Sequence, residues 1–308
     1  MWILEDKLAI SPLPRRSDIP ELARVFDAVV VLVEPHELMG LVDQYLSAWH
    51  SYGVETLYAP IPDFHPAELL ELHRINMWIN EKLEKGYRVL VHCHGGIGRS
   101  GMVAIAYLIY RGMDFYKAVT SVREKRPGAA ENEAQLRILE DYHELYTVLA
   151  NSLDIHVKKL YDMGKREYLH ASKSLQVVIE LVSDSGISID KPVLYKSLLY
   201  HCLRENELEE LARSGIIDED VIELIKRAGE EKYADIEPLL LAIGHTSDYY
   251  YDQRVVFTNS ERIGDTTYTV FYCKYGCKEV IDKLKPLFNK LGEFLERVFE
   301  LSEQPYTY

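Results

Sequence analysis

The 308-residue sequence has few cysteines, no long hydrophobic run and no basic N-terminal segment. Four cysteines in so long a chain do not indicate the disulfide scaffold of a small secreted domain. No stretch approaches the roughly 18 consecutive apolar residues that a membrane span needs. Acids stand in the first ten residues, where a signal peptide would carry bases. We therefore expect a cytoplasmic location and no membrane partner.

Basic residues are also in the minority. The chain has 35 Lys and Arg against 49 Asp and Glu, a formal net charge of -14, and the acids are spread along it rather than collected in a tail. This balance disfavours nucleic acid and anionic membranes as partners. With 47% hydrophobic residues the sequence is typical of a globular protein, and its length allows two domains.

The first half alternates short apolar runs with helical patterns. Candidate strands are residues 7–11, 28–33, 54–59 and 88–92, and candidate helices are 35–51, 66–85, 98–111, 115–126 and 131–149. Strands separated by helices predict an α/β fold with a mainly parallel central sheet flanked by helices.

The pattern changes near residue 150. Helical patterns cover 151–183, 191–203, 207–213, 218–229 and 234–243, a hairpin is expected within 251–273, and a last amphipathic helix is expected over 278–301. We therefore predict a first domain over 1–150 and a mostly α-helical C-terminal domain with a β-hairpin over 151–308.

One stretch, LVHCHGGIGRSGMVAIAYL at 90–108, combines a thiol with a glycine-rich loop. A strand is expected to end at His92, and a helix to begin near Arg99. The loop amides and the positive end of the helix dipole then converge on one point, which favours an oxyanion. The same field favours a thiolate, so that Cys93 is a candidate nucleophile.

Arg99 and Ser100 complete the candidate site. The planar guanidinium could hold two phosphate oxygens, and the hydroxyl could donate to the thiolate when it leaves. The loop would bind phosphate mainly through its backbone, and its residues are His94, Gly95, Gly96, Ile97 and Gly98. This set suits displacement on phosphorus through a covalent thiophosphate, with no metal and no cofactor.

His92-Cys93, five residues, then Arg99-Ser100-Gly101 resembles the signature of the cysteine-dependent protein tyrosine and dual-specificity phosphatases. The resemblance covers about residues 1–150 and is strongest to the short archaeal-type members. It implies a phosphoprotein phosphatase that forms a phosphocysteine intermediate. The alternative, a buried cysteine in a glycine-rich turn, does not account for Arg99.

The family also carries a general acid on a mobile loop about thirty residues before the cysteine. Asp63 matches that position, and its alternative role is a helix N-cap near Pro66. Gln135 resembles a water-positioning glutamine of some members, and otherwise would be an exposed helix residue. Arg126 could assist substrate binding or cap a helix.

The substrate expected from this resemblance is a single phosphate on a protein side chain, with phosphotyrosine ahead of phosphoserine and phosphothreonine. The reason is that no lysine lies between Cys93 and Arg99, where lipid-phosphatase relatives usually carry bases. The alternatives are a phosphate-binding scaffold without turnover and a phosphatase acting on RNA 5′ ends or inositides. The second domain could select substrates or bind a protein partner.

The remaining cysteines lie in the second half. His201-Cys202, together with Cys273 and Cys277, offers metal-ligand atoms, but with a spacing unusual for structural zinc. We favour a core Cys202 and a Cys273–Cys277 pair that is reduced or weakly bridged, with zinc and a disulfide as the alternatives. The tyrosines of DYYYD, at 248–252, are expected to pack or hydrogen-bond, and the alternative is a phosphorylated segment on which the first domain acts.

Overall fold

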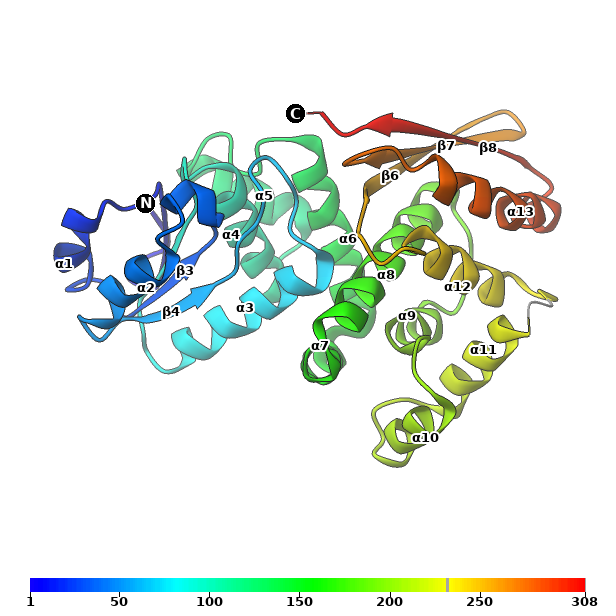
Figure 1. Ribbon diagram of the computed structural model, residues 1–308, viewed down its shortest axis with the longest axis horizontal. Helices are drawn as coiled ribbons and strands as arrows, with labels where there is room; N and C mark the ends of the chain where they lie inside the picture. The colour runs from blue at the N-terminus through cyan, green and yellow to red at the C-terminus, as the bar shows by residue number, and fades with distance from the viewer. Residues whose placement is uncertain (231–232, 308) are drawn as a thin grey trace. The chain divides into compact units, whose positions relative to one another are not determined.

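A computed structural model describes residues 1–230 and 233–307 (Figure 1). The chain forms two compact units. The first contains Met1–Ala67 and Glu71–His143, and the second contains Glu68–Leu70 and Glu144–Thr307. Each unit is described separately below.

A five-stranded sheet forms the centre of the first unit. Its strands are β1 (Trp2–Leu4), β2 (Leu8–Ser11), β3 (Ala28–Val31), β4 (Glu55–Tyr58) and β5 (Val89–His92), in the order β1-β2-β5-β3-β4. The pairs of β2 with β5, β5 with β3 and β3 with β4 are parallel, and β1 is antiparallel to β2. The expected mainly parallel sheet is confirmed, and only the three-residue β1 was not predicted.

Helices cover both faces of this sheet. They are α1 (Ile19–Leu22), α2 (Val42–His50), α3 (Leu69–Glu84), α4 (Gly98–Tyr110), α5 (Phe115–Lys125) and α6 (Glu133–Leu149), with short 3-10 turns η1 (Arg16–Asp18) and η2 (Pro35–Leu38). Val29 and Val31 of β3 pack in one apolar cluster with Trp49 of α2. All four residues of β3 are buried, as expected of a strand with helices on both sides.

The single helix expected over 35–51 is wrong. Met39 and Gly40 have φ values of 53° and 74°, in the left-handed region, and they separate η2 from α2. Glu37 therefore lies in η2, a separate short turn, and not in α2.

The second unit is mostly helical and ends in a small sheet. Its helices are η3 (Ala150–Ser152), α7 (Leu153–Met163), α8 (Lys165–Ser185), α9 (Lys191–Tyr200), α10 (Glu205–Arg213), α11 (Glu219–Gly229), α12 (Ile236–Ser247) and α13 (Lys278–Leu295). The strands β6 (Val255–Ile263) and β7 (Thr266–Cys273) form the expected hairpin, and β8 (Val298–Pro305) pairs in parallel with β7.

Two predicted helices of this unit have wrong bounds. The helix expected over 151–183 is broken at Gly164, whose φ of 144° is outside the helical region. The helix expected over 278–301 ends at Leu295 because Glu296 is left-handed, with a φ of 50°. The chain then forms β8, where pairing with β7 supplies the backbone hydrogen bonds and buries Phe299.

The cysteine predictions for the second unit are corrected as well. Cys273, at the end of β7, and Cys277, just before α13, form a disulfide with a Cα–Cα distance of 6.2 Å. Cys202 is an exposed free thiol rather than a core residue. The disulfide removes Cys273 and Cys277 from any set of metal ligands.

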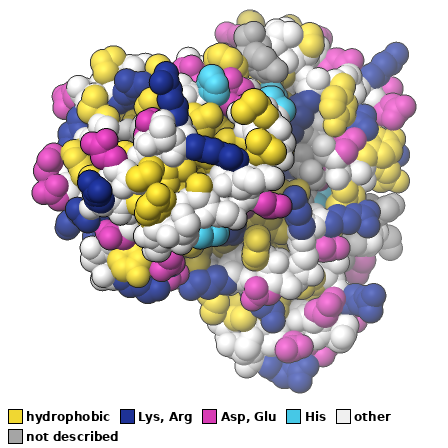
Figure 2. Space-filling model, turned by 60° about the vertical axis from the view of Figure 1, so that its left-hand side comes forward, with side chains coloured by type: hydrophobic (Ala, Val, Ile, Leu, Met, Phe, Trp, Pro, Cys, Tyr) yellow, Lys and Arg dark blue, Asp and Glu magenta, His cyan; other side chains and the backbone are white. Residues whose placement is uncertain are grey.

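The surface carries mixed charge. On the face drawn in Figure 2, Lys and Arg side chains are interspersed with Asp and Glu side chains. Among the helices of the described residues, none combines the length and apolar content of a membrane-spanning segment.

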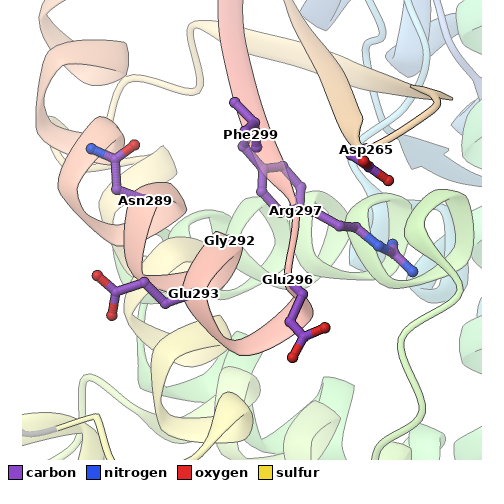
Figure 3. A pocket seen from close by; sticks show the side chains of 8 residues that line it. Asp265, Asn289, Gly292, Glu293, Glu296, Arg297 and Phe299 are labelled. Carbon is purple, nitrogen blue, oxygen red and sulfur yellow. The ribbon is translucent and has the colours of Figure 1, made fainter.

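A pocket of the second unit lies where α13 ends and β8 begins (Figure 3). It is lined by Asp265, Asn289, Gly292, Glu293, Glu296, Arg297, Val298 and Phe299. Its one arginine is already engaged, because Nη1 of Arg297 donates to the carbonyl of Ser185 at 2.9 Å. None of the lining residues is a cysteine or a histidine, so this pocket is not the candidate active site.

Candidate active site

The thiol of Cys93 lies in the loop between β5 and α4, as predicted. It is almost fully buried, with 2% of the residue exposed. The amide of Gly96 donates to Sγ at 3.2 Å, and Oγ of Ser100 lies 3.4 Å from Sγ. Both groups can donate hydrogen bonds to a thiolate, which stabilises the nucleophilic form.

The loop has room only for the backbone at Gly96. This residue is left-handed, with a φ of 69°, and a Cβ atom there would collide with the backbone of Ser11 and Pro12. A side chain at this position would therefore be excluded both by strain and by contact. We predicted a glycine here because the loop must turn. The close approach of the Ser11 and Pro12 backbone also requires one at Gly96.

Arg126, at the end of α5, fixes the direction of the loop peptides. Its Nε donates to the carbonyl of Gly96 at 2.8 Å, and its Nη2 donates to that of Gly95 at 3.1 Å. In a trans peptide the N–H points away from the C=O. The amides of Gly96 and Ile97 therefore point away from Arg126, and the first of them donates to Cys93 Sγ. Arg126 thus orients the amides predicted to bind phosphate, a role that the two predicted alternatives did not include.

Arg99 is held by a carboxylate that the sequence did not single out. The guanidinium is 1% exposed and makes a two-pronged pair with Glu37, at 2.7 Å for Nη1 and 2.8 Å for Nη2. Nη1 also donates to the carbonyl of Ile61 at 2.9 Å. Burial raises the pKa of Glu37, but the hydrogen bonds from Arg99 outweigh it, so the pKa lies below its usual value. Glu37 therefore stays ionised and fixes the plane of the guanidinium.

Asp63 lies beside Arg99, on the loop after β4. Its Oδ1 is 2.9 Å from Nη2 of Arg99, and its side chain is 47% exposed. The alternative role as a helix cap is wrong, because α3 begins only at Leu69. An acid that is open to solvent and adjacent to Arg99, the candidate phosphate ligand, is in place to reach a leaving group.

The Asp63 loop is tied to the segment that precedes and begins α6. Nδ2 of Asn132 donates to the carbonyl of Phe64 at 2.7 Å, and Nε2 of Gln135 donates to that of His65 at 3.4 Å. Gln135 is fully buried, so its alternative role as an exposed helix residue is wrong. Its Oε1 accepts from the amide of Glu131 at 3.0 Å.

Glu131 is a second acid that sequence reasoning missed. The position of a Cβ on Gly98 would overlap its carboxylate, which places Glu131 next to the start of α4. Burial, and then the charge of Asp63, raise the pKa of Glu131. The two acids are therefore near enough to affect each other, and both are candidates for proton transfer.

His92 supports the end of β5. Its ring is fully buried, and Nε2 lies 3.1 Å from the hydroxyl of Tyr45 on α2. Burial lowers the pKa of His92 to about 4, so the ring is neutral near pH 7. The hydrogen bond to Tyr45 ties the end of β5 to α2.

We expect Glu37→Gln to raise the KM for an aryl phosphate by about 10- to 100-fold, the effect of losing one charged hydrogen bond worth roughly 1.5–3 kcal/mol. The amide can accept only one of the two N–H groups, so Arg99 loses its fixed plane. Steady-state kinetics measure the change. Glu21→Gln, on the exposed side of α1, is the matched control. A lower Tm with unchanged KM would instead give Glu37 a purely structural role.

Comparisons with known proteins agree with this geometry. The family model "Dual specificity phosphatase, catalytic domain" matches residues 41–144. Phosphatidylglycerophosphate phosphatase PTPMT2 of Arabidopsis thaliana is 29% identical over 152 residues, which cover 48% of this chain and 65% of that protein. Dual specificity protein phosphatase 12 of Rattus norvegicus is 28% identical over 172 residues, with 54% and 48% covered. The chain therefore spans less than two thirds of the length of these relatives.

A solved structure gives a more complete match. The active form of Tk-PTP is 44% identical to this chain, with a TM-score of 0.44 over 46% of this chain and 95% of that one. Nearly the whole of that protein thus corresponds to less than half of this chain. The family match, together with the thiol, the loop and the arginine described above, identifies residues 41–144 as a catalytic domain of the dual-specificity phosphatase family.

Proposed function

We propose that the protein hydrolyses phosphate monoesters on protein side chains, phosphotyrosine above all, through a phosphocysteine intermediate. One observation carries the proposal. A buried thiol, the inward-pointing amides of its loop and a guanidinium held by Glu37 occur together at the junction of β5 and α4. This set combines a nucleophile with groups that stabilise the charge of a phosphoryl group in transfer.

In the first step the thiolate of Cys93 attacks phosphorus. The S–P bond forms while the bond from phosphorus to the ester oxygen breaks, and Asp63 in its acid form gives that oxygen a proton. Arg99 and the loop amides hold the other phosphate oxygens. The Asp63 carboxyl already lies 2.9 Å from Arg99, so it is near the bound phosphate.

In the second step water attacks the phosphocysteine. Asp63, now ionised, takes the proton, the P–S bond breaks, and inorganic phosphate is released. The hydroxyl of Ser100, 3.4 Å from Sγ, stabilises the departing thiolate. Gln135, buried beside the Asp63 loop, is the proposed residue that positions the water.

The charge around the loop supports a substrate with one phosphate. No lysine or arginine stands between Cys93 and Arg99. Arg99 already pairs with Glu37 and Asp63, so it cannot balance a second phosphate in full. A phenol, with a pKa near 10, also leaves more readily than the alcohol of serine or threonine. These features favour phosphotyrosine.

The PTPMT2 relative makes a lipid substrate the second candidate, since its name describes a phosphatidylglycerophosphate phosphatase. The test is a comparison of kcat/KM for four substrates: a phosphotyrosine peptide, a phosphothreonine peptide, dispersed phosphatidylglycerophosphate and an inositol phosphate. We expect the phosphotyrosine peptide to lead by about tenfold or more, the order of discrimination that one set of pocket contacts gives. A lipid substrate that leads by that margin would replace the proposal, and no turnover of any of them would favour the phosphate-binding scaffold.

We further propose that the phosphatase domain spans residues 1–150 and that residues 151–308 form an accessory domain that binds a protein partner in the cytoplasm. The short length of Tk-PTP supports the first part, because 46% of this chain covers 95% of it.

A further inference from the structure

Four side chains with metal-binding atoms meet in the second unit. His170 lies in α8, His201 and Cys202 directly follow α9, and His245 lies in α12. These three helices pack side by side (Figure 1). The ligand atoms of the four residues all lie within 4.8 Å of one another. This cluster plays no part in the proposed phosphatase chemistry.

The three imidazole nitrogens form a nearly equal triangle. Nε2 of His170 lies 3.2 Å from Nε2 of His201 and 3.1 Å from Nδ1 of His245, and the third side is 3.0 Å. Tetrahedral zinc with Zn–N bonds of about 2.0–2.1 Å separates its nitrogens by about 3.3 Å. Sγ of Cys202 lies 4.0 Å from Nδ1 of His245, where a tetrahedral site needs about 3.6 Å. The spacing is therefore close to that of a metal site.

Hydrogen bonds among the three ring nitrogens cannot explain why all three lie so close together. A ring nitrogen offers one hydrogen or one lone pair in the ring plane, so three such atoms cannot each bond both neighbours. Two of the rings are also fixed from outside. Nδ1 of His201 lies 2.8 Å from the carbonyl of Leu198, which can only accept, and Nδ1 of His170 lies 3.0 Å from Oδ2 of Asp248. Both Nδ1 atoms therefore carry hydrogen, and in the neutral rings, the form that binds a metal, both Nε2 atoms present lone pairs to the shared centre.

The residues around the cluster support the same arrangement. Asp248 is buried and receives hydrogen bonds from the amide of Gln253 at 2.9 Å and from its Nε2 at 3.1 Å. A carboxylate behind a ligating histidine is the usual outer partner at metal sites. Tyr251 stacks on the ring of His170, and its hydroxyl lies 3.6 Å from Sγ of Cys202. The 248–252 segment thus packs and hydrogen-bonds, in support of this cluster.

We propose that His170, His201, Cys202 and His245 bind one divalent transition metal ion, with Zn²⁺ the best match. Imidazole and thiolate ligands suit zinc and exclude the oxygen-seeking Mg²⁺ and Ca²⁺. Four protein ligands leave no open position, so the ion would link α8, α9 and α12 rather than bind a substrate. The exposed Cys202 gives the ion a way in from solvent. This proposal replaces the sequence-based expectation of no metal.

The test uses the full chain without a histidine tag. Elemental analysis should find about one zinc per chain, and chelation followed by Co²⁺ alone should give the sulfur-to-cobalt charge-transfer absorption that a thiolate ligand produces. Removing the metal should lower Tm by several degrees, and added Zn²⁺ should restore it. Cys202→Ser should abolish the charge-transfer band.

Cys93→Ser is the matched control, because it removes the other free thiol and should keep the band, the zinc and the metal-dependent Tm. His245→Ala should lower the zinc content, whereas His50→Ala, on an exposed histidine of α2, should not. A chain that binds neither Zn²⁺ nor Co²⁺ would overturn the proposal. So would a band that survives Cys202→Ser and disappears in Cys93→Ser, because the metal would then lie at the phosphatase loop.

Discussion

Cys93→Ser should lower the turnover of an aryl phosphate by about 10⁴-fold or more, the scale of loss seen when an enzymatic nucleophile is removed. The hydroxyl is a far weaker nucleophile than the thiolate. Phosphate binding should survive, because it depends on Arg99 and on amides oriented by Arg126, and neither group is changed. Steady-state kinetics measure the first effect, and isothermal titration with inorganic phosphate measures the second.

Cys202→Ser is the matched control for this experiment, since it removes a free thiol outside the phosphatase loop and should keep aryl phosphate turnover. A folded Cys93→Ser protein that retains turnover would remove Cys93 from the nucleophile role. Loss of phosphate binding together with loss of fold would mean that the buried thiol is needed mainly for packing.

The loop could be predicted because its chemistry is local in the sequence. Cys93, Arg99 and Ser100 lie within eight residues between a strand and a helix, and the backbone there brings them together with little help from distant segments. Asp63 was placed through the family resemblance, and the structure brings its carboxylate to Arg99. The catalytic roles of these residues remain predictions.

Contacts made to the loop by distant residues could not be found in this way, although Arg126 was considered for substrate binding. Glu37 lies 62 positions from Arg99, and Arg126 lies 30 positions from Gly96. Each is one charged residue among many in an unremarkable helical pattern, and only the fold gives it a partner. Prediction from one sequence relies on short, recurring spacings along the chain. These contacts join residues that are far apart and follow no such spacing.

The histidine cluster of the second unit could not be predicted from the sequence for the same reason. His170 is 31 positions from His201 and 75 from His245, so no short motif links them. Sequence reasoning instead grouped His201 and Cys202 with Cys273 and Cys277, and the latter pair forms a disulfide. The end of α13 was mispredicted because Val298, Phe299 and Leu301 fit a helical face as well as the strand that they form.

Asp63→Asn should lower kcat by about 10²–10⁴-fold for aryl phosphates with poor leaving groups, the range expected when a general acid is lost. Substrates with acidic phenols should lose much less, because their phenolates leave without a proton. KM should fall as well, since Asp63 now competes with phosphate for Nη2 of Arg99 at 2.9 Å. The measurement is kcat and KM across a series of aryl phosphates of rising leaving-group pKa.

Glu131→Gln is the matched control, because Glu131 is the other acid near the loop and its pKa is raised by burial and by Asp63. If Asp63 is the acid, Glu131→Gln should leave the dependence on leaving-group pKa unchanged, with kcat within about threefold of the natural protein for a surface-side change of this kind. If the steep dependence instead appears in Glu131→Gln and not in Asp63→Asn, the proton comes from Glu131. Asp63 would then act by holding Arg99 in place, because the ion pair between them would be its only remaining contribution to the loop.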